Sequence, residues 1–472
     1  MSKAIDAAFD PSRKPVGQPS ALRPQIAVAQ WSTMRIRASA FSIACLLTGA
    51  CYSIRVNIIG EATLAELLLP LLGLYAIAHP GGRKVFQTKV FWILLLSMLA
   101  TLGGYVLSDL IRETPQAQYL RGWGRMALVI TGFLSLSLMV AMQRQSLWWF
   151  VAGMGIGRIL YLRLMLGTPI SMWKFSQDGF GYGEPFTLAA AALAYFLPPR
   201  WASVVLAAVG AASVYYDFRI QSLVCLMIAG LVWARSRRPD QPVKSGTGQL
   251  QLAVLLTATI VMIYAGLKLS ESDYAANRRD VSDIGRKAGK TFAMKAISES
   301  PLIGYGSWSR SAQFQRMHEQ ALKEIAGRDA TRFRPGDSSS ATHAMLLQSW
   351  VEGGILAIAF FVVLGFCLVR SLFTLTLGRP MDALSPILVY FALYGLWHIT
   401  MSAFAAPLRI HLALAAVCCV CVALEAMTAR DHRRLLARDR QRMARPTVPP
   451  GRFGVPAWNT GKPQARAQRA SR

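Results

Sequence analysis

Charged residues are scarce in this sequence. They make up 16% of it, against about 25% in a typical soluble domain. Hydrophobic residues account for 53%, and they gather in long runs. A run of about 20 apolar residues is long enough to cross the hydrocarbon core of a membrane. This composition argues against an ordinary soluble enzyme and predicts an all-α, polytopic membrane protein.

Acidic residues are also few: 24 Asp and Glu stand against 51 Lys and Arg, which gives a formal net charge of +27. In a soluble protein this excess would suggest a nucleic-acid partner. Here many of the basic residues lie in the two tails and in short loops, as expected for segments retained on the cytoplasmic side. We therefore predict no nucleic acid as a partner, and contact of the tails with anionic membrane lipids.

Several signatures of metal and redox chemistry are missing. All seven cysteines lie in apolar runs, which argues against a disulfide framework or a cysteine metal site. There is no DxD-like external pair, no HxxxH pair and no glycine-rich phosphate loop. No metal and no cofactor are predicted, so an enzyme of this sequence would need Arg and Lys for positive charge. The guanidinium fork of Arg suits a diphosphate.

The hydrophobic runs predict about twelve spans. No apolar run adjoins the polar N-terminus as in a signal peptide, so no cleaved leader is expected. The spans are predicted at 38–54, 57–79, 90–108, 122–142, 147–168, 186–199, 201–216, 220–234, 249–269, 346–369, 382–400 and 405–427.

Basic residues follow the even-numbered spans, so those ends are predicted to be cytoplasmic. Three polar segments then lie outside: 109–121, 169–185 and 270–345. The third has helix-like patterning at 285–300 and 311–327, and we expect a helical periplasmic cap between spans nine and ten. The predicted organisation is an N-terminal cytoplasmic tail at 1–37, spans at 38–269, the loop domain at 270–345, spans at 346–427, and a basic, disordered cytoplasmic tail at 428–472.

Four ionisable residues near the membrane boundaries are candidates for function, because charge at membrane depth is costly. Arg219 lies at the outer end of span eight, Arg286 in the outer loop, and His343 where that loop re-enters the membrane. Glu352 follows His343 on the same predicted helix. Each has a plain structural alternative: Arg219 pairs with Asp217, Arg286 is one of many loop cations, and His343 begins a helix. For Glu352 we favour a buried carboxylate bonded to a neighbouring span.

Four stretches of sequence share a pattern with a known family. They are GYGEPFTLAAAALAYFLP at 181–198, DFRIQSLVCLMIAGLVW at 217–233, IGRKAGKTFAMKAISESPLIGYGSW at 284–308 and HAMLLQSWVEGGILAIAFF at 343–361. The third has Gly-Arg and then Pro-x-x-Gly-x-Gly, and the fourth has His and then Glu-x-Gly before an apolar helix. In this order and separation, they resemble the bacterial O-antigen ligase/polymerase superfamily over residues 180–375.

The resemblance implies a metal-independent glycosyltransferase in the bacterial inner membrane, with its active site facing the periplasm. Such proteins transfer a glycan from an undecaprenyl-diphosphate carrier to an acceptor hydroxyl, which in the ligases belongs to lipid A-core. By resemblance, Arg219 and Arg286 hold the diphosphate, and His343 takes the acceptor proton as general base. The residues implied to shape the motif and its loop are Glu352, Pro301, Gly304 and Gly306.

Two alternatives remain open at this level. One is an O-antigen or exopolysaccharide polymerase, whose acceptor is the next lipid-linked repeat unit. The other is a polysaccharide or lipid transporter without chemistry. Transporters often consist of two related halves. No such internal repeat is evident here and the large outer loop is asymmetric, which favours an enzyme.

Overall fold

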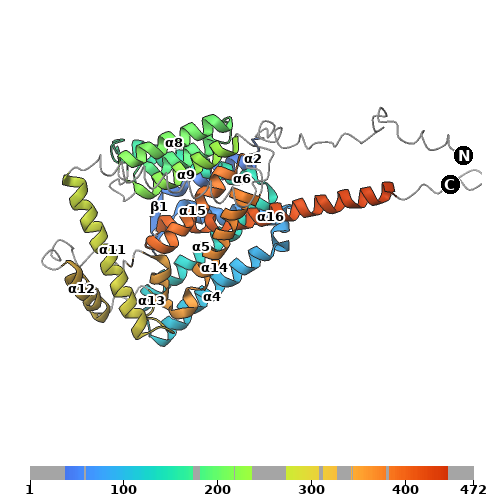
Figure 1. Ribbon diagram of the computed structural model, residues 1–472. Coiled ribbons are helices and arrows are strands. Elements are labelled where there is room, and N and C mark those ends of the chain that lie inside the picture. Colours follow the sequence, from blue (N-terminus) through green and yellow to red (C-terminus); the bar gives the residue numbers. More distant parts are fainter. Residues whose placement is uncertain are drawn as a thin grey trace, which may run out of the picture. The chain divides into compact units, whose positions relative to one another are not determined.

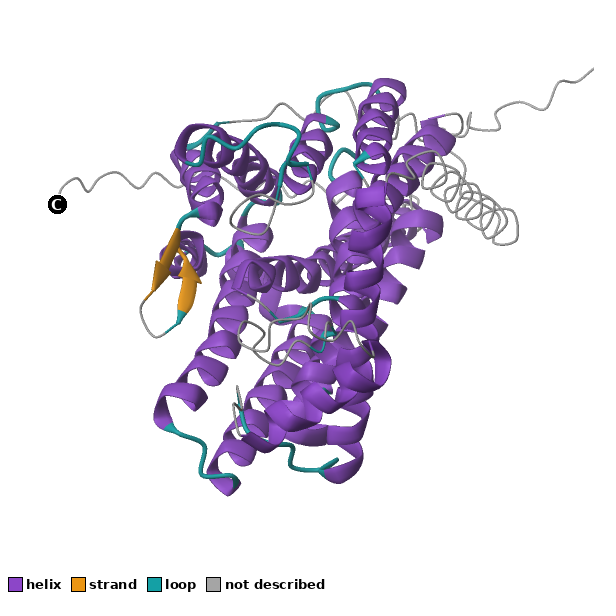
Figure 2. Ribbon diagram, turned by 90° about the vertical axis from the view of Figure 1, so that its left-hand side faces the viewer, coloured by secondary structure: helices purple, strands orange, loops and turns teal. Residues whose placement is uncertain are grey.

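The computed structural model describes residues 38–57, 60–173, 181–216, 218–236, 273–307, 312–326, 342, 344–378, 382–404 and 406–444. These residues are mostly helical, with one two-stranded hairpin, shown in orange in Figure 2. The predicted all-α class is thereby confirmed. The chain divides into two compact units, residues 1–424 and 425–472, and the bundle described below belongs to the first.

The N-terminal half of the bundle alternates helices with short connections. Its elements are α2 (Ala40–Ala50), η1 (Cys51–Ser53), β1 (Arg55–Asn57), β2 (Glu61–Thr63), α3 (Leu64–Ala78), η2 (Gly82–Gln87), α4 (Lys89–Ile111), α5 (Gln116–Met142), α6 (Gln145–Leu160), η3 (Tyr161–Met165), α7 (Gly183–Leu193), α8 (Pro199–Tyr215) and α9 (Arg219–Ser236).

The C-terminal half begins with two polar helices and returns to apolar ones. Its elements are α11 (Asp273–Glu299), α12 (Ala312–Ala326), α13 (Met345–Ala357), α14 (Ala359–Phe373), η5 (Thr374–Gly378), α15 (Ser385–Met401) and α16 (Ala406–Ala444). The predicted span at 249–269 lies outside the described residues.

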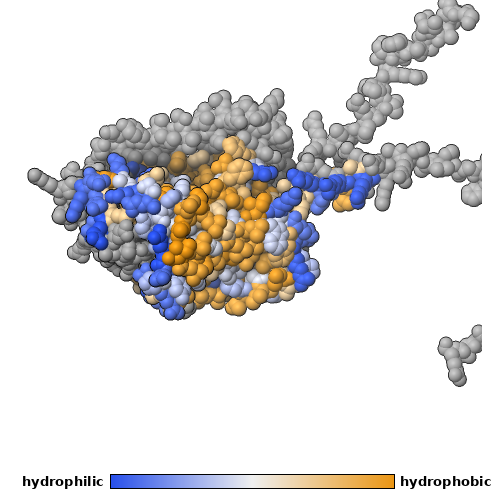
Figure 3. All heavy atoms as spheres, turned by 90° about the horizontal axis from the view of Figure 1, so that it is seen from below, coloured by the Kyte–Doolittle hydropathy of each residue, from blue (hydrophilic) through white to orange (hydrophobic). Residues whose placement is uncertain are grey.

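Among the residues that the structure describes, five helices are long and apolar enough to cross a membrane: Lys89–Ile111, Gln116–Met142, Gln145–Met165, Ala359–Thr376 and Leu408–Arg438. Four shorter apolar helices accompany them, at Ala40–Ser53, Leu64–Ala78, Arg219–Ala234 and Ser385–Met401. Figure 3 shows a broad hydrophobic surface in the middle of one face, with hydrophilic residues at its left-hand and right-hand ends. An exposed apolar surface of this extent marks an interaction site, and with these helices it indicates a membrane protein. The number of twelve spans stays a prediction.

One predicted span is interrupted. The sequence predicts a continuous helix over 346–369, whereas the structure has α13 and α14 on either side of Ile358. Gly354 has φ +69°, a left-handed conformation that glycine adopts without steric cost. A Cβ at this position would lie 2.0 Å from the carbonyl oxygen of Leu302, so the loop that contains Leu302 occupies the space of a side chain.

Glycines allow α2 and α6 to pack with their backbones almost in contact. A Cβ on Gly49 would lie 2.1 Å from the carbonyl oxygen of Phe150, and one on Gly153 would lie 2.1 Å from that of Leu46. Small residues on facing helices allow this close approach in membrane bundles. The contact fixes the end of α2, and hence η1, beside the C-terminal end of α6.

The long hydrophilic segment contains the two helices that the sequence predicts. Helices α11 and α12 pack side by side, shown in yellow and brown in Figure 1. Phe292 and Ala296 of α11 share a small hydrophobic cluster with Met317 of α12 and Val351 of α13. The helices within 270–345 are therefore confirmed, and their periplasmic location stays a prediction.

Cysteine labelling tests that location. Lys295 on α11 and Lys84 in η2 both have exposed side chains. In a variant without native cysteines, we expect a membrane-impermeant maleimide to label Lys295→Cys in intact spheroplasts and not Lys84→Cys. Both should react after solubilisation, which controls for reactivity. Labelling of Lys84→Cys alone from outside would contradict the predicted topology.

Candidate functional site

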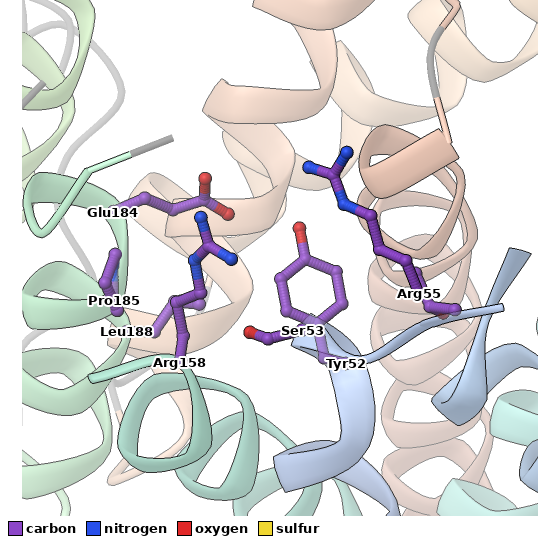
Figure 4. A pocket seen from close by; sticks show the side chains of 8 residues that line it. Tyr52, Ser53, Arg55, Arg158, Glu184, Pro185 and Leu188 are labelled. Carbon is purple, nitrogen blue, oxygen red and sulfur yellow. The ribbon is translucent and has the colours of Figure 1, made fainter. Parts of the chain in front are cut away.

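An arginine-lined pocket opens among four elements of the bundle (Figure 4). About 380 Å³ of empty space lies in and in front of it, and this figure includes open solvent at its mouth. The residues that line it come from η1, the hairpin, α6 and α7, and they are Tyr52, Ser53, Arg55, Thr63, Arg158, Glu184, Pro185 and Leu188. Below, "the pocket" refers to this set.

Local structure explains why these residues meet. The close contact of α2 with α6 brings Tyr52 of η1 near Arg158. The hairpin pairs Arg55 with Thr63, which begins α3 through a capping box with Glu66. Arg55 also forms an ion pair with Glu61 of the hairpin, with 2.5 Å between Nη1 and Oε1.

Two charged groups of the pocket, Arg158 and Glu184, are deeply buried, whereas Arg55 is exposed. Arg158 is 5% exposed and Glu184 is 4% exposed. Figure 4 shows both side chains, the hydroxyl of Tyr52 and the guanidinium of Arg55 directed toward the same space. Burying a charge is costly unless it is paired or has a ligand to bind. A cluster of this kind beside a cavity is therefore a better candidate for a functional site than a charge on the surface.

A histidine contacts two of the residues that line the pocket. The Nε2 atom of His411, on α16, lies 2.5 Å from Oε1 of Glu184. The Nδ1 atom of the same ring lies within hydrogen-bond distance, 3.3 Å, of the Tyr52 hydroxyl. His411 therefore lies in polar contact with two residues that line the pocket, Glu184 and Tyr52.

A buried ion pair holds the hairpin beside the pocket. Arg409 of α16 donates to both carboxylate oxygens of Glu66, at 2.7 and 2.8 Å, and to the carbonyl oxygen of Glu61 at 2.7 Å. This two-pronged geometry is the strongest that an arginine offers a carboxylate. The pair therefore ties the hairpin and the start of α3 to α16.

Glu352 lies in a second polar cluster, on α13. Its side chain is 1% exposed and forms an ion pair with Arg125 of α5, while Oε1 accepts from Gln348 at 3.1 Å. Gln348 in turn accepts from the backbone N–H of Phe404 at 2.9 Å, and the Arg125 guanidinium lies over the Phe404 ring. The interpretation of Glu352 as a buried carboxylate bonded to a neighbouring helix agrees with these contacts.

The motif loop at 301–307 is bonded to this cluster. The backbone N–H groups of Tyr305 and Gly306 donate to the carbonyl oxygens of Val351 and Glu352, each at 2.9 Å. Arg112, which directly follows α4, donates to the Gly304 carbonyl at 2.9 Å.

Left-handed glycines and a tryptophan set the shape of this loop. Gly304 and Gly306 have φ of +79° and +88°, a region that glycine enters most easily. Trp350 donates to the Pro301 carbonyl at 2.9 Å. Pro301, Gly304 and Gly306 therefore lie in a hydrogen-bonded turn, and their role in a functional motif stays a prediction.

Of the three predicted catalytic residues, only Arg219 is described with its side chain. Arg219 begins α9 and is half-buried; its carbonyl accepts from Ser222 at 2.7 Å. Arg286 belongs to α11, and the described part of the structure does not include its side chain. His343 lies outside the described residues. Their roles stay predictions.

Sequence reasoning singled out Glu352 but missed four other buried charged or ionisable residues of these clusters. Arg125 lies within the fourth predicted span, Arg158 within the fifth, and Arg409 and His411 within the twelfth. The signal was available, because an ionisable residue inside a hydrophobic run is a candidate for function.

Comparison with known proteins adds no family assignment. The chain matches no family model, and no curated protein matches it.

The Arg125–Glu352 pair predicts a large effect on stability. Arg125→Met leaves a buried carboxylate without its cation, so we expect unfolding to become easier by about 3 to 5 kcal/mol. Thermal unfolding in detergent measures this. Arg121→Met, which changes an exposed arginine on the same helix, is the control and should have little effect. Replacing both Arg125 and Glu352 by Met should recover much of the loss. Wild-type stability of Arg125→Met alone would show that the pair does not support the fold.

Proposed function

We propose that the protein is an O-antigen ligase-like glycosyltransferase. It transfers a glycan from an undecaprenyl-diphosphate carrier to an acceptor hydroxyl on the periplasmic side of the bacterial inner membrane. The acceptor is lipid A-core in the ligase form of this proposal, and a lipid-linked glycan in the polymerase form. Both forms use the same donor chemistry.

The observation that carries the proposal is the pocket with its two arginines, in a protein with apolar helices. Under the predicted topology, the hairpin and the start of α7 lie toward the periplasm, where the head of a lipid-diphosphate donor would be found. Arg158 and Arg55 have the charge and fork geometry that a diphosphate requires. The ion pair of Arg55 with Glu61 is one-third exposed, so it is weak enough for an anion to compete with it.

The same groups favour the chemical step. As the bond between the sugar and the diphosphate breaks, its electron pair stays on the leaving oxygen, and negative charge grows there. Fixed guanidinium groups stabilise that charge without reorganisation. The acceptor oxygen forms the new bond to the sugar, and its proton passes to a base, for which the resemblance supplies His343.

A transfer assay tests the proposal. Purified protein in lipid is supplied with an undecaprenyl-diphosphate glycan and with lipid A-core or a second lipid-linked glycan, in the presence of EDTA, and the product is identified by mass spectrometry. We expect a glycan joined to one of the acceptors. Stable, correctly oriented protein that makes no such product from either acceptor would overturn the proposal.

Arg158→Gln measures the role of the pocket in that assay. Loss of hydrogen bonds from a charged donor costs about 1.5 to 3 kcal/mol, which corresponds to a decrease of about ten- to a hundredfold in kcat/KM. Arg163→Gln is the matched control, because Arg163 is exposed in η3 directly after α6. An equal effect of both changes would remove the pocket from the mechanism.

The residues implied by the resemblance predict different defects. His343→Ala should lower the rate by about 10²- to 10⁴-fold and leave donor binding nearly intact. Arg219→Lys should impair turnover although charge is kept, because the fork is lost, and Arg286→Ala should also weaken donor binding. Each variant is first checked for normal abundance in the membrane. A wild-type rate for stable His343→Ala protein would rule out His343 as the base.

A further inference from the structure

Glu184 is an unexpected residue in a pocket that suits an anion. It lies in the first turn of α7, is 4% exposed, and lines the pocket together with Arg55 and Arg158. Because like charges repel, a carboxylate in this position weakens the binding of a phosphate. A pocket that served only to hold an anion would bind it better without Glu184. The carboxylate therefore calls for a role of its own.

The neighbours of Glu184 leave most of its hydrogen-bonding capacity unused. Nε2 of His411 lies 2.5 Å from Oε1, an ion-pair contact when the imidazole is protonated. Among the described residues, Oε1 has no hydrogen-bond partner. A carboxylate has about four acceptor sites, and burying acceptors without hydrogen bonds is costly. A hydrogen from His411 would fill only one site, so capacity remains whatever the protonation state of that ring.

A second polar group of the pocket also lacks a partner. Ser53 is the last residue of η1 and is 4% exposed, and its hydroxyl oxygen has no hydrogen-bond partner in the described part of the chain. Figure 4 shows the Glu184 carboxylate and the Ser53 hydroxyl among the side chains around the same space. Buried polar groups nearly always have partners. Two that line one pocket without them indicate that it takes a molecule with hydrogen-bonding groups.

A ligand that suits all of these groups has an anion next to hydrogen-bond donors. The anion would face Arg55 and Arg158, and hydroxyl groups would donate to Glu184. The hydroxyl of Ser53 can donate and accept, so it could serve either part of the ligand. A sugar with a phosphate on its anomeric carbon has both parts within a few bonds. A simple phosphate ester has only the anion.

We propose that Glu184 is a specificity-determining residue that accepts hydrogen bonds from sugar hydroxyls, so that the pocket selects glycosyl phosphates over simple phosphate esters. Its negative charge penalises an anion that comes alone, and the hydroxyl groups of a sugar offset that penalty. The inference rests on the proposed function, because it places the sugar next to the diphosphate in this pocket. Glu184 acts through charge and hydrogen bonding, and it makes or breaks no bond.

Binding of two small probes tests the inference. Isothermal titration calorimetry on the full-length protein in nanodiscs compares α-D-glucose 1-phosphate with ethyl phosphate, which lacks hydroxyl groups. Hydrogen bonds to a charged group correspond to a wild-type preference of about tenfold or more for the sugar phosphate. Glu184→Gln should reduce that preference by about fivefold, because a neutral acceptor is weaker. It should also raise the affinity for ethyl phosphate by about twofold or more, because the opposing charge is gone.

A second variant and a control complete the test. Glu184→Asp keeps the charge but withdraws the oxygens, so it should reduce the preference without raising the affinity for ethyl phosphate. Glu113→Gln removes an exposed charge outside the pocket and should change neither affinity.

Two outcomes in the variants would overturn the inference: an unchanged preference in Glu184→Gln, or an equal loss of affinity for both probes in both variants, as expected for a packing role. Wild-type protein that binds neither probe, or binds both equally, would overturn it as well. The transfer assay is independent of these measurements, so the proposed function and this inference can fail separately.

Discussion

The structure depends on how its buried charges are paired. A lone ion in an apolar interior is so costly that each one needs a fixed partner, and in the first unit these partners come from distant parts of the chain. Arg125 of α5 meets Glu352 of α13, and Arg409 of α16 meets Glu66 of α3. Apolar packing has little directional preference, whereas an ion pair has a definite geometry. The two pairs therefore fix which helices are neighbours, and they place the hairpin and the motif loop next to the bundle.

The fold class was predictable because it depends on the length and polarity of long runs. The helices at 40–50, 89–111 and 385–401 follow directly from their apolar stretches, as do the two polar helices of the long hydrophilic segment. The features that the sequence did not predict are changes of backbone conformation at a few positions. The hairpin replaces the start of a predicted span, and Gly354 interrupts another, because single backbone conformations hardly change the average hydropathy of a window.

The candidate site was only partly predictable, for a related reason. The burial of Glu352 and its bond to a neighbouring helix could be expected, since a carboxylate on an apolar helix needs a partner. The pocket was not anticipated because its members lie on η1, α6 and α7, with His411 on α16 behind them. Helix packing brings these residues together, above all the glycine contact between α2 and α6. A single sequence shows that such charges exist but not which of them meet.

The interruption of α13 at Gly354 also determines how the motif loop can evolve. The carbonyl oxygens of Val351 and Glu352 accept hydrogen bonds from Tyr305 and Gly306 at the point where the helix is broken. Two backbone amides of the loop thus bind carbonyl groups of α13, a helix that is distant in the sequence. Hydrophilic loops usually tolerate insertions and deletions. Between Leu302 and Ser307 a change of length by one residue would move the two amides out of register with these carbonyls, so this stretch should keep its length while its surroundings vary.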